Sequence, residues 1–191
     1  MTEKENLELI RNMIDRTKGN LRAQSGYYLI WGWLVLLATL SEYVLIQFMP
    51  EFVHHYIVWP VVVLIGVGAT IYLSAKQKKD RRVTTYADRA LVYFWSSWGF
   101  VLFLLLFYTI FGGLDWGNSY AFIIALYGMG ATVSGGILKF KALVYGGVFS
   151  SAIAAFTLFT GISNDFEAML LFLALSVASS YLIPGYQLRR S

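Results

Sequence analysis

The sequence predicts an all-α fold, a polytopic transmembrane bundle of six helical spans preceded by an amphipathic helix. Of the 191 residues, 58% are hydrophobic and only 14% are charged, a balance far from that of a soluble domain. The mean hydropathy is +0.60, and the apolar residues form continuous blocks of about twenty, enough helix to cross a hydrocarbon core of about 30 Å. A membrane β-barrel is excluded because its strands would alternate apolar and polar residues.

The composition also excludes several functional classes. Such a high apolar content rules out a soluble enzyme, a nucleic-acid-binding domain and a disordered tail. Cysteine is absent, which rules out a disulfide-stabilised scaffold. The class that remains is an integral membrane protein.

Hydropathy windows of about nineteen residues define the individual elements. The expected spans are 27–49, 52–75, 91–111, 119–138, 142–162 and 166–186, between a cytoplasmic arm at 1–26 and a cytoplasmic tail at 187–191. An even number of spans places both termini on the same side of the membrane.

The fifteen lysine and arginine residues indicate which side that is. They lie in the arm (Lys4, Arg11, Arg16, Lys18, Arg22), after the second span (Lys76, Lys78, Lys79, Arg81, Arg82, Arg89), after the fourth (Lys139, Lys141) and after the sixth (Arg189, Arg190). The three opposite connections contain none and carry Glu51, Asp115 and Asp165. Because basic residues accumulate in cytoplasmic loops, we expect both termini in the cytoplasm. The absence of cysteine and the short outer connections favour the inner (cytoplasmic) membrane of a bacterium.

The amino-terminal arm has the pattern of an amphipathic helix. Thr2 and Glu5 have capping-box spacing. Leu7, Ile10, Ile14, Thr17 and Leu21 then follow at an alternating spacing of three and four, and all but Thr17 are apolar. Either this helix packs on the bundle's own cytoplasmic face, or Leu7, Ile10 and Ile14 contact a second copy or another membrane protein.

The basic connection after the second span carries enough charge to bind anionic lipid headgroups. The headgroup candidates are Lys76, Lys78, Lys79, Arg81 and Arg82. The alternative is that these charges only set the topology of the chain. Nucleic acid is not an expected partner; the lipid bilayer is.

Small residues at i, i+4 spacing predict which spans pack closely. Such stripes occur in the second span (Gly66, Thr70, Ser74), the fourth (Gly128, Thr132, Gly136), the fifth (Gly147, Ser151, Ala155) and the sixth (Ala174, Ala178). We therefore expect these four spans at the centre of the bundle and the bulky third span against lipid. Aromatic residues near the span ends, including Trp31, Trp33 and Trp59, are interpreted as interfacial anchors.

Glu42 is the only acidic residue well inside a span, and an intramembrane carboxylate is a functional hypothesis by default. It lies eight residues before Pro50, so it can reach the depth of His54 and His55 at the start of the next span. A carboxyl and an imidazole in hydrogen-bond contact could exchange a proton. Glu42, His54 and His55 therefore form the candidate intramembrane polar site.

The alternative for Glu42 is a structural role, with the carboxyl hydrogen-bonded to Tyr43, Tyr56 or a backbone carbonyl. A metal site is not predicted, because adjacent helical histidines diverge by about 100° and no HExxH spacing is present. No cofactor is expected. No nucleophilic cysteine, G-x-S-x-G elbow or P-loop occurs, so the sequence does not predict an enzyme and offers no catalytic residue.

The charged arm, the junction Gly26-Tyr-Tyr-Leu-Ile-Trp-Gly-Trp33 and the basic loop resemble an uncharacterised family of small bacterial multi-span inner-membrane proteins with no known activity. The resemblance covers about the first ninety residues and implies a bacterial inner membrane, with no functional residue to carry over. The leading interpretation is a non-enzymatic accessory, regulatory or scaffold subunit. The alternative is a small transporter or channel that uses Glu42 with His54 or His55 as a titratable element.

Overall fold

The computed structural model describes residues 3–49, 51–52, 54–80 and 86–190, with side chains described for 23–49, 51–52, 54–77 and 86–190. Within these ranges the chain is helical and contains no strand. The elements are α1 (Glu3–Phe48), η1 (His55–Ile57), α2 (Val58–Asp80), α3 (Tyr86–Gly112), α4 (Trp116–Leu138), α5 (Lys141–Thr160), η2 (Ile162–Asn164), α6 (Phe166–Val177), η3 (Ala178–Leu182) and α7 (Ile183–Arg190). The all-α prediction is confirmed.

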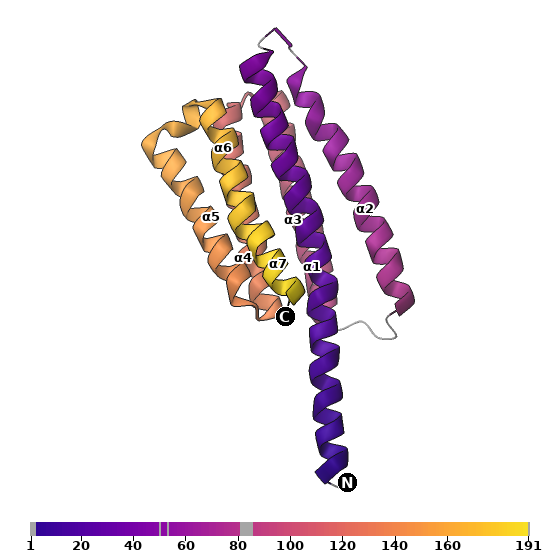
Figure 1. Ribbon diagram of the computed structural model, residues 1–191. Coiled ribbons are helices and arrows are strands. Elements are labelled where there is room, and N and C mark those ends of the chain that lie inside the picture. The colour runs from indigo at the N-terminus through magenta and orange to yellow at the C-terminus, as the bar shows by residue number, and fades with distance from the viewer. Residues whose placement is uncertain (1–2, 50, 53, 81–85, 191) are drawn as a thin grey trace.

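Six helical stretches of the described chain are long and apolar enough to cross a membrane. They are Ala23–Phe48, His55–Gln77, Tyr86–Gly112, Trp116–Leu138, Lys141–Thr160 and Phe166–Arg190. Each overlaps one predicted span, so the prediction of a six-span bundle is also confirmed. Both chain ends lie toward the same end of the bundle (Figure 1); this end is called the terminal end below, and the opposite one the distal end.

The amino-terminal arm is not a separate element but the beginning of α1. The helix runs without a break from Glu3 to Phe48. Its first turns extend beyond the terminal end of the bundle, in line with the rest of α1, rather than folding across the other helices (Figure 1). The chain therefore presents a helical arm that stands clear of the bundle.

At two of the connections, an aspartate directly precedes the next helix. The Asp115 carboxylate accepts a hydrogen bond from the Asn118 backbone N–H at 3.1 Å, and Asp165 does the same for Ala168 at 3.1 Å. Each aspartate therefore caps the start of a helix, α4 and α6 respectively. The sixth span contains a π-helical turn, η3, which ends two residues before Pro184. A proline lacks the N–H that an α-helix needs, which accounts for the altered hydrogen bonding at this place.

The centre of the bundle is formed by α4, α5 and α6 together with α1. Half of the most apolar window of α4 is buried and 39% of that of α5, but only 6% of that of α3. The window of the sixth span is also half buried, so the expected central position of the fourth, fifth and sixth spans is confirmed, and the third span is exposed, as a helix facing lipid would be. The expected central position of the second span is wrong, because only 11% of the α2 window is buried against 33% for α1.

The small residues of α2 have a different use from those of α4 and α5. A Cβ on Gly147 would lie 2.5 Å from the carbonyl oxygen of Gly128, so α4 and α5 approach backbone to backbone. A Cβ on Gly66 would instead lie 2.7 Å from the indole ring of Trp31 on α1. The stripe on α2 therefore makes room for one large side chain and not for a second helix backbone. Most of α2 stays exposed.

Candidate functional site

Glu42 lies on α1 near its distal end and is almost completely buried, with 1% of its surface exposed. Unpaired carboxylates are very costly in such surroundings, so its hydrogen-bond partners decide whether it is stable there. Three side chains surround it. The Nδ1 atom of His55 lies 3.0 Å from Oε1, the indole N–H of Trp59 donates to Oε2 at 2.7 Å, and the Tyr120 hydroxyl donates to Oε2 at 2.9 Å.

These partners come from separate parts of the chain. His55 belongs to η1, Trp59 to the first turn of α2 and Tyr120 to α4. His55 and Trp59 are four residues apart, so they lie one above the other on the same side of the chain. The carboxyl of Glu42 thereby connects α1 to the start of the exposed helix α2 and to the central helix α4.

The hydrogen-bonding chemistry restricts where a proton can lie. An indole N–H can only donate, so Oε2 of Glu42 must act as an acceptor toward Trp59. Any proton that Glu42 and His55 exchange then lies between Oε1 of Glu42 and Nδ1 of His55. Two arrangements satisfy the contact: a carboxylate that accepts from a protonated Nδ1, or a carboxylic acid that donates to a bare Nδ1.

Aromatic rings close the cluster on its inner side. The rings of Trp59 and Tyr120 lie edge to face with centroids 6.0 Å apart, and Phe166 at the start of α6 packs on Tyr120 at 5.1 Å. Phe166 also lies 6.5 Å from the ring of His55. His55 keeps 31% of its side chain exposed, so this imidazole is the part of the cluster that meets the surroundings.

The two predicted histidines behave differently. His54 is exposed, and its Nδ1 lies 3.1 Å from the hydroxyl of Tyr56 instead of facing Glu42. Tyr56 and Tyr43, expected as structural partners of Glu42, are therefore replaced in that role by Trp59 and Tyr120. A second polar contact lies nearby, where the Gln47 side-chain amide donates to Glu167.

Trp59 and Tyr120 are site residues that the sequence interpretation missed. Its place near a span end predicts an interfacial role for Trp59, although its spacing of four from His55 is a signal that both side chains point the same way. Tyr120 carries no such signal, because it is 78 residues from Glu42 and reaches it only through the packing of α4 against α1.

The remaining predicted residues lie elsewhere. Lys76 is exposed at the terminal end of α2. The side chains of Lys78, Lys79, Leu7, Ile10 and Ile14, and the whole of Arg81 and Arg82, lie outside the described part of the structure. Among the residues that are described, no three acidic or histidine side chains converge closely enough to hold a metal ion.

Comparison with known proteins found no matching family model, no matching curated protein and no matching solved structure. The resemblance to small bacterial inner-membrane proteins stays a prediction.

Proposed function

We propose that this multi-pass membrane protein is a non-enzymatic accessory, regulatory or scaffold subunit of a bacterial inner membrane, with both termini in the cytoplasm. The observation that carries the proposal is the continuous helix α1, whose first turns extend past the bundle (Figure 1). A helix outside the bundle with apolar residues at a spacing of three and four is suited to contact another helix.

The simplest partner for this arm is the arm of a second copy. Copies inserted in one membrane share their orientation, so their arms extend from the same side and run parallel. The arm's positive and negative side chains nearly cancel, five basic against four acidic residues up to Arg22. Attraction to an anionic membrane surface is correspondingly weak, which favours a protein partner over the lipid surface.

The test replaces Leu7, Ile10 and Ile14 together by asparagine in the full chain. The matched control carries Asn12→Ser and Arg16→Gln, two changes on the opposite side of the same helix. Self-association in liposomes is measured by energy transfer between labelled copies. We expect the triple variant to lose at least tenfold in association while the control retains it; equal association in all three proteins would refute the proposal.

A second candidate function is a small transporter or channel gated by a proton at Glu42. It is favoured by the contact of 3.0 Å between Glu42 and a histidine that is partly exposed. In this case Glu42→Gln abolishes a pH-dependent flux across proteoliposomes and removes a carboxyl band that titrates in infrared difference spectra. His54→Gln is the matched control, because His54 lies outside the hydrogen bonds of Glu42. A carboxyl band that does not change between about pH 5 and 9 rejects this candidate.

A further inference from the structure

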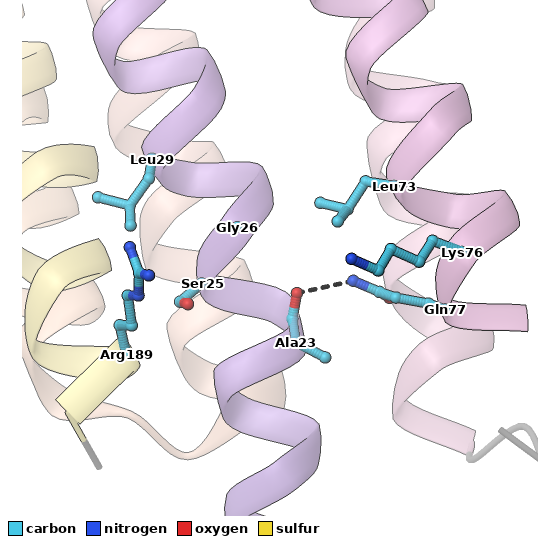
Figure 2. Close-up of a pocket in the computed structure, with 8 residues that line it drawn as sticks. All are labelled: Ala23, Ser25, Gly26, Leu29, Leu73, Lys76, Gln77 and Arg189. Atoms are coloured by element: carbon cyan, nitrogen blue, oxygen red, sulfur yellow. Dashed lines mark hydrogen bonds between the residues drawn. The ribbon is translucent and has the colours of Figure 1, made fainter. Parts of the chain in front are cut away.

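An open hollow lies at the terminal end of the bundle, where α2 and α7 flank α1 (Figure 2). Its volume is about 270 Å³, and it is called the cationic hollow below. Its lining residues are Ala23, Ser25, Gly26, Leu29, Leu73, Lys76, Gln77 and Arg189. They include two cations and no acidic residue.

The two cations come from opposite sides of α1. Lys76 extends from α2 and Arg189 from α7, 113 positions later in the sequence (Figure 2). The neighbouring Gln77 amide donates to the Ala23 carbonyl oxygen at 2.9 Å, which holds the end of α2 beside α1. Both cations are thus placed around one hollow by the fold, not by proximity in the sequence.

A second hollow, of about 380 Å³, continues from the first toward the middle of the bundle. The two share Leu29 and Arg189. The other lining residues of the second hollow are Ile30, Trp33, Leu34, Ile65, Ala69 and Tyr186. Except for the shared arginine, its lining is aliphatic or aromatic. It is called the apolar hollow, and the two together are called the groove.

The groove has the length of one lipid leaflet. Along α1 its lining runs from Ala23 to Leu34, which at 1.5 Å per residue is about 16 Å. Half of a hydrocarbon core of about 30 Å is nearly the same distance. The charged end of the groove lies at the end of the membrane-spanning helices, and its apolar end lies at the depth of acyl chains.

Two aromatic side chains in the wall of the apolar hollow are joined by a hydrogen bond. The Trp33 indole N–H donates to the Tyr186 hydroxyl at 3.0 Å across α1 and α7. A hydroxyl that accepts one hydrogen bond can still donate another, and here it lies in the same wall as Arg189.

We propose that the groove binds one anionic phospholipid from the surrounding leaflet. Its phosphate-bearing headgroup occupies the cationic hollow between Lys76 and Arg189, and an acyl chain lies in the apolar hollow. Charge complementarity selects an anionic headgroup, since two cations and no acid line that end. The adjoining apolar hollow selects a lipid over a small soluble anion.

The test titrates the purified full chain in detergent with phosphatidylglycerol or with phosphatidylcholine of the same acyl chains, and counts bound lipid by native mass spectrometry. The charge variant carries Lys76→Gln and Arg189→Gln. Its control carries Lys141→Gln and Arg190→Gln, which removes the same charge from exposed positions outside the groove. Ala69→Leu fills the apolar hollow, and Ala155→Leu adds the same side chain to an exposed position on α5.

We expect the wild type to retain one phosphatidylglycerol more tightly than phosphatidylcholine. The charge variant loses about thirty-fold in affinity for phosphatidylglycerol and each single change about fivefold, with both controls unchanged. Ala69→Leu lowers the affinity without any change of charge. The thermal midpoint of each variant, measured without added lipid, shows that it is folded.

Three results would overturn the proposal. Equal losses in the charge variant and its control would mean general attraction to a basic surface. Equal affinity for the two lipids would remove the role of Lys76 and Arg189. Displacement of the lipid by glycerophosphoglycerol or inorganic phosphate at the same concentration as by whole lipid would mean a site for a soluble anion.

Discussion

The Oε1 atom of Glu42 lies 3.0 Å from Nδ1 of His55, across the connection between the first two spans. This contact, with those to Trp59 and Tyr120, joins the largely exposed second span to the centre of the bundle. The helix α2 is mostly exposed, and the carboxyl of Glu42 is the group to which side chains of both η1 and α2 are hydrogen-bonded. The cluster therefore has a structural effect whether or not it also moves a proton.

Glu42→Gln and Glu42→Leu are expected to differ strongly in stability. The glutamine oxygen can accept from Trp59 and Tyr120 while its amide donates to a bare Nδ1 of His55, so all three contacts survive. Leucine leaves the indole N–H and the hydroxyl without an acceptor, at about 1–3 kcal/mol for each buried donor. Thermal unfolding in detergent should show a midpoint near that of the wild type for Glu42→Gln and a clearly lower one for Glu42→Leu. Similar losses in both would contradict the assigned hydrogen bonds.

The sequence placed Glu42 and both histidines at a similar depth, which made a contact possible, but it did not show which histidine makes it. Depth along a span follows from residue counts, so Glu42 and the pair at 54 and 55 could be placed at one level. Which of these two adjacent residues faces Glu42 depends on how the chain is rotated about its axis where η1 begins. Hydropathy contains no information about that rotation. The contacts of Tyr120 and Arg189 depend on how distant helices pack, which is also absent from a single sequence.

Two buried tyrosines should respond in opposite ways to the loss of their hydroxyl. Tyr120→Phe removes a donor to Glu42 and should cost about 1–2 kcal/mol in the free energy of unfolding. Tyr181 is 2% exposed, and its hydroxyl has no hydrogen-bond partner among the described residues. Tyr181→Phe should therefore be neutral or stabilising, because it removes a buried polar group that is not paired. Unfolding by denaturant in micelles compares the two, and a larger loss for Tyr181→Phe would refute this expectation.

The contact between α4 and α5 should not tolerate a side chain on the facing glycines. In Gly147→Ala the new methyl group would lie 2.5 Å from the Gly128 carbonyl oxygen, so the helices must separate. Overpacking of this kind costs about 1–3 kcal/mol. Gly136→Ala on α4 is the control, because a Cβ there has no atom within 4 Å apart from its chain neighbours and the backbone of its own helix. The thermal midpoint should fall for Gly147→Ala and stay constant or rise for Gly136→Ala; an equal response would mean that this contact is loose.

The small residues of α2 and those of α4 and α5 both predict close packing of helix backbones, but in the structure only those of α4 and α5 make it. Gly128 and Gly147 face each other, as expected for close helix backbones. Gly66 faces the ring of Trp31, a residue assigned to the membrane interface from its position near a span end. A stripe of small residues indicates that something approaches closely, but the sequence does not show whether it is a backbone or a large side chain.

Thr70→Val should loosen α2 from α1, although it changes the shape of the side chain at this position very little. The Trp31 indole N–H donates to the Thr70 hydroxyl oxygen at 3.0 Å, and valine keeps the volume while removing the acceptor. Hydrogen bonds between membrane helices contribute about 0.6 kcal/mol on average and up to about 1.7, so a loss in this range is expected. Thr160→Val is the matched control, since the Thr160 hydroxyl bonds only the Phe156 carbonyl of its own helix among the described contacts.

Because the chain contains no cysteine, a cysteine pair introduced on α1 and α2 reports their separation by its rate of disulfide formation. A rate that is slower in Thr70→Val than in Thr160→Val would show that this bond holds α2 in place, and equal rates would show that the other bonds between α1 and α2, those of Glu42 and Gln77, suffice.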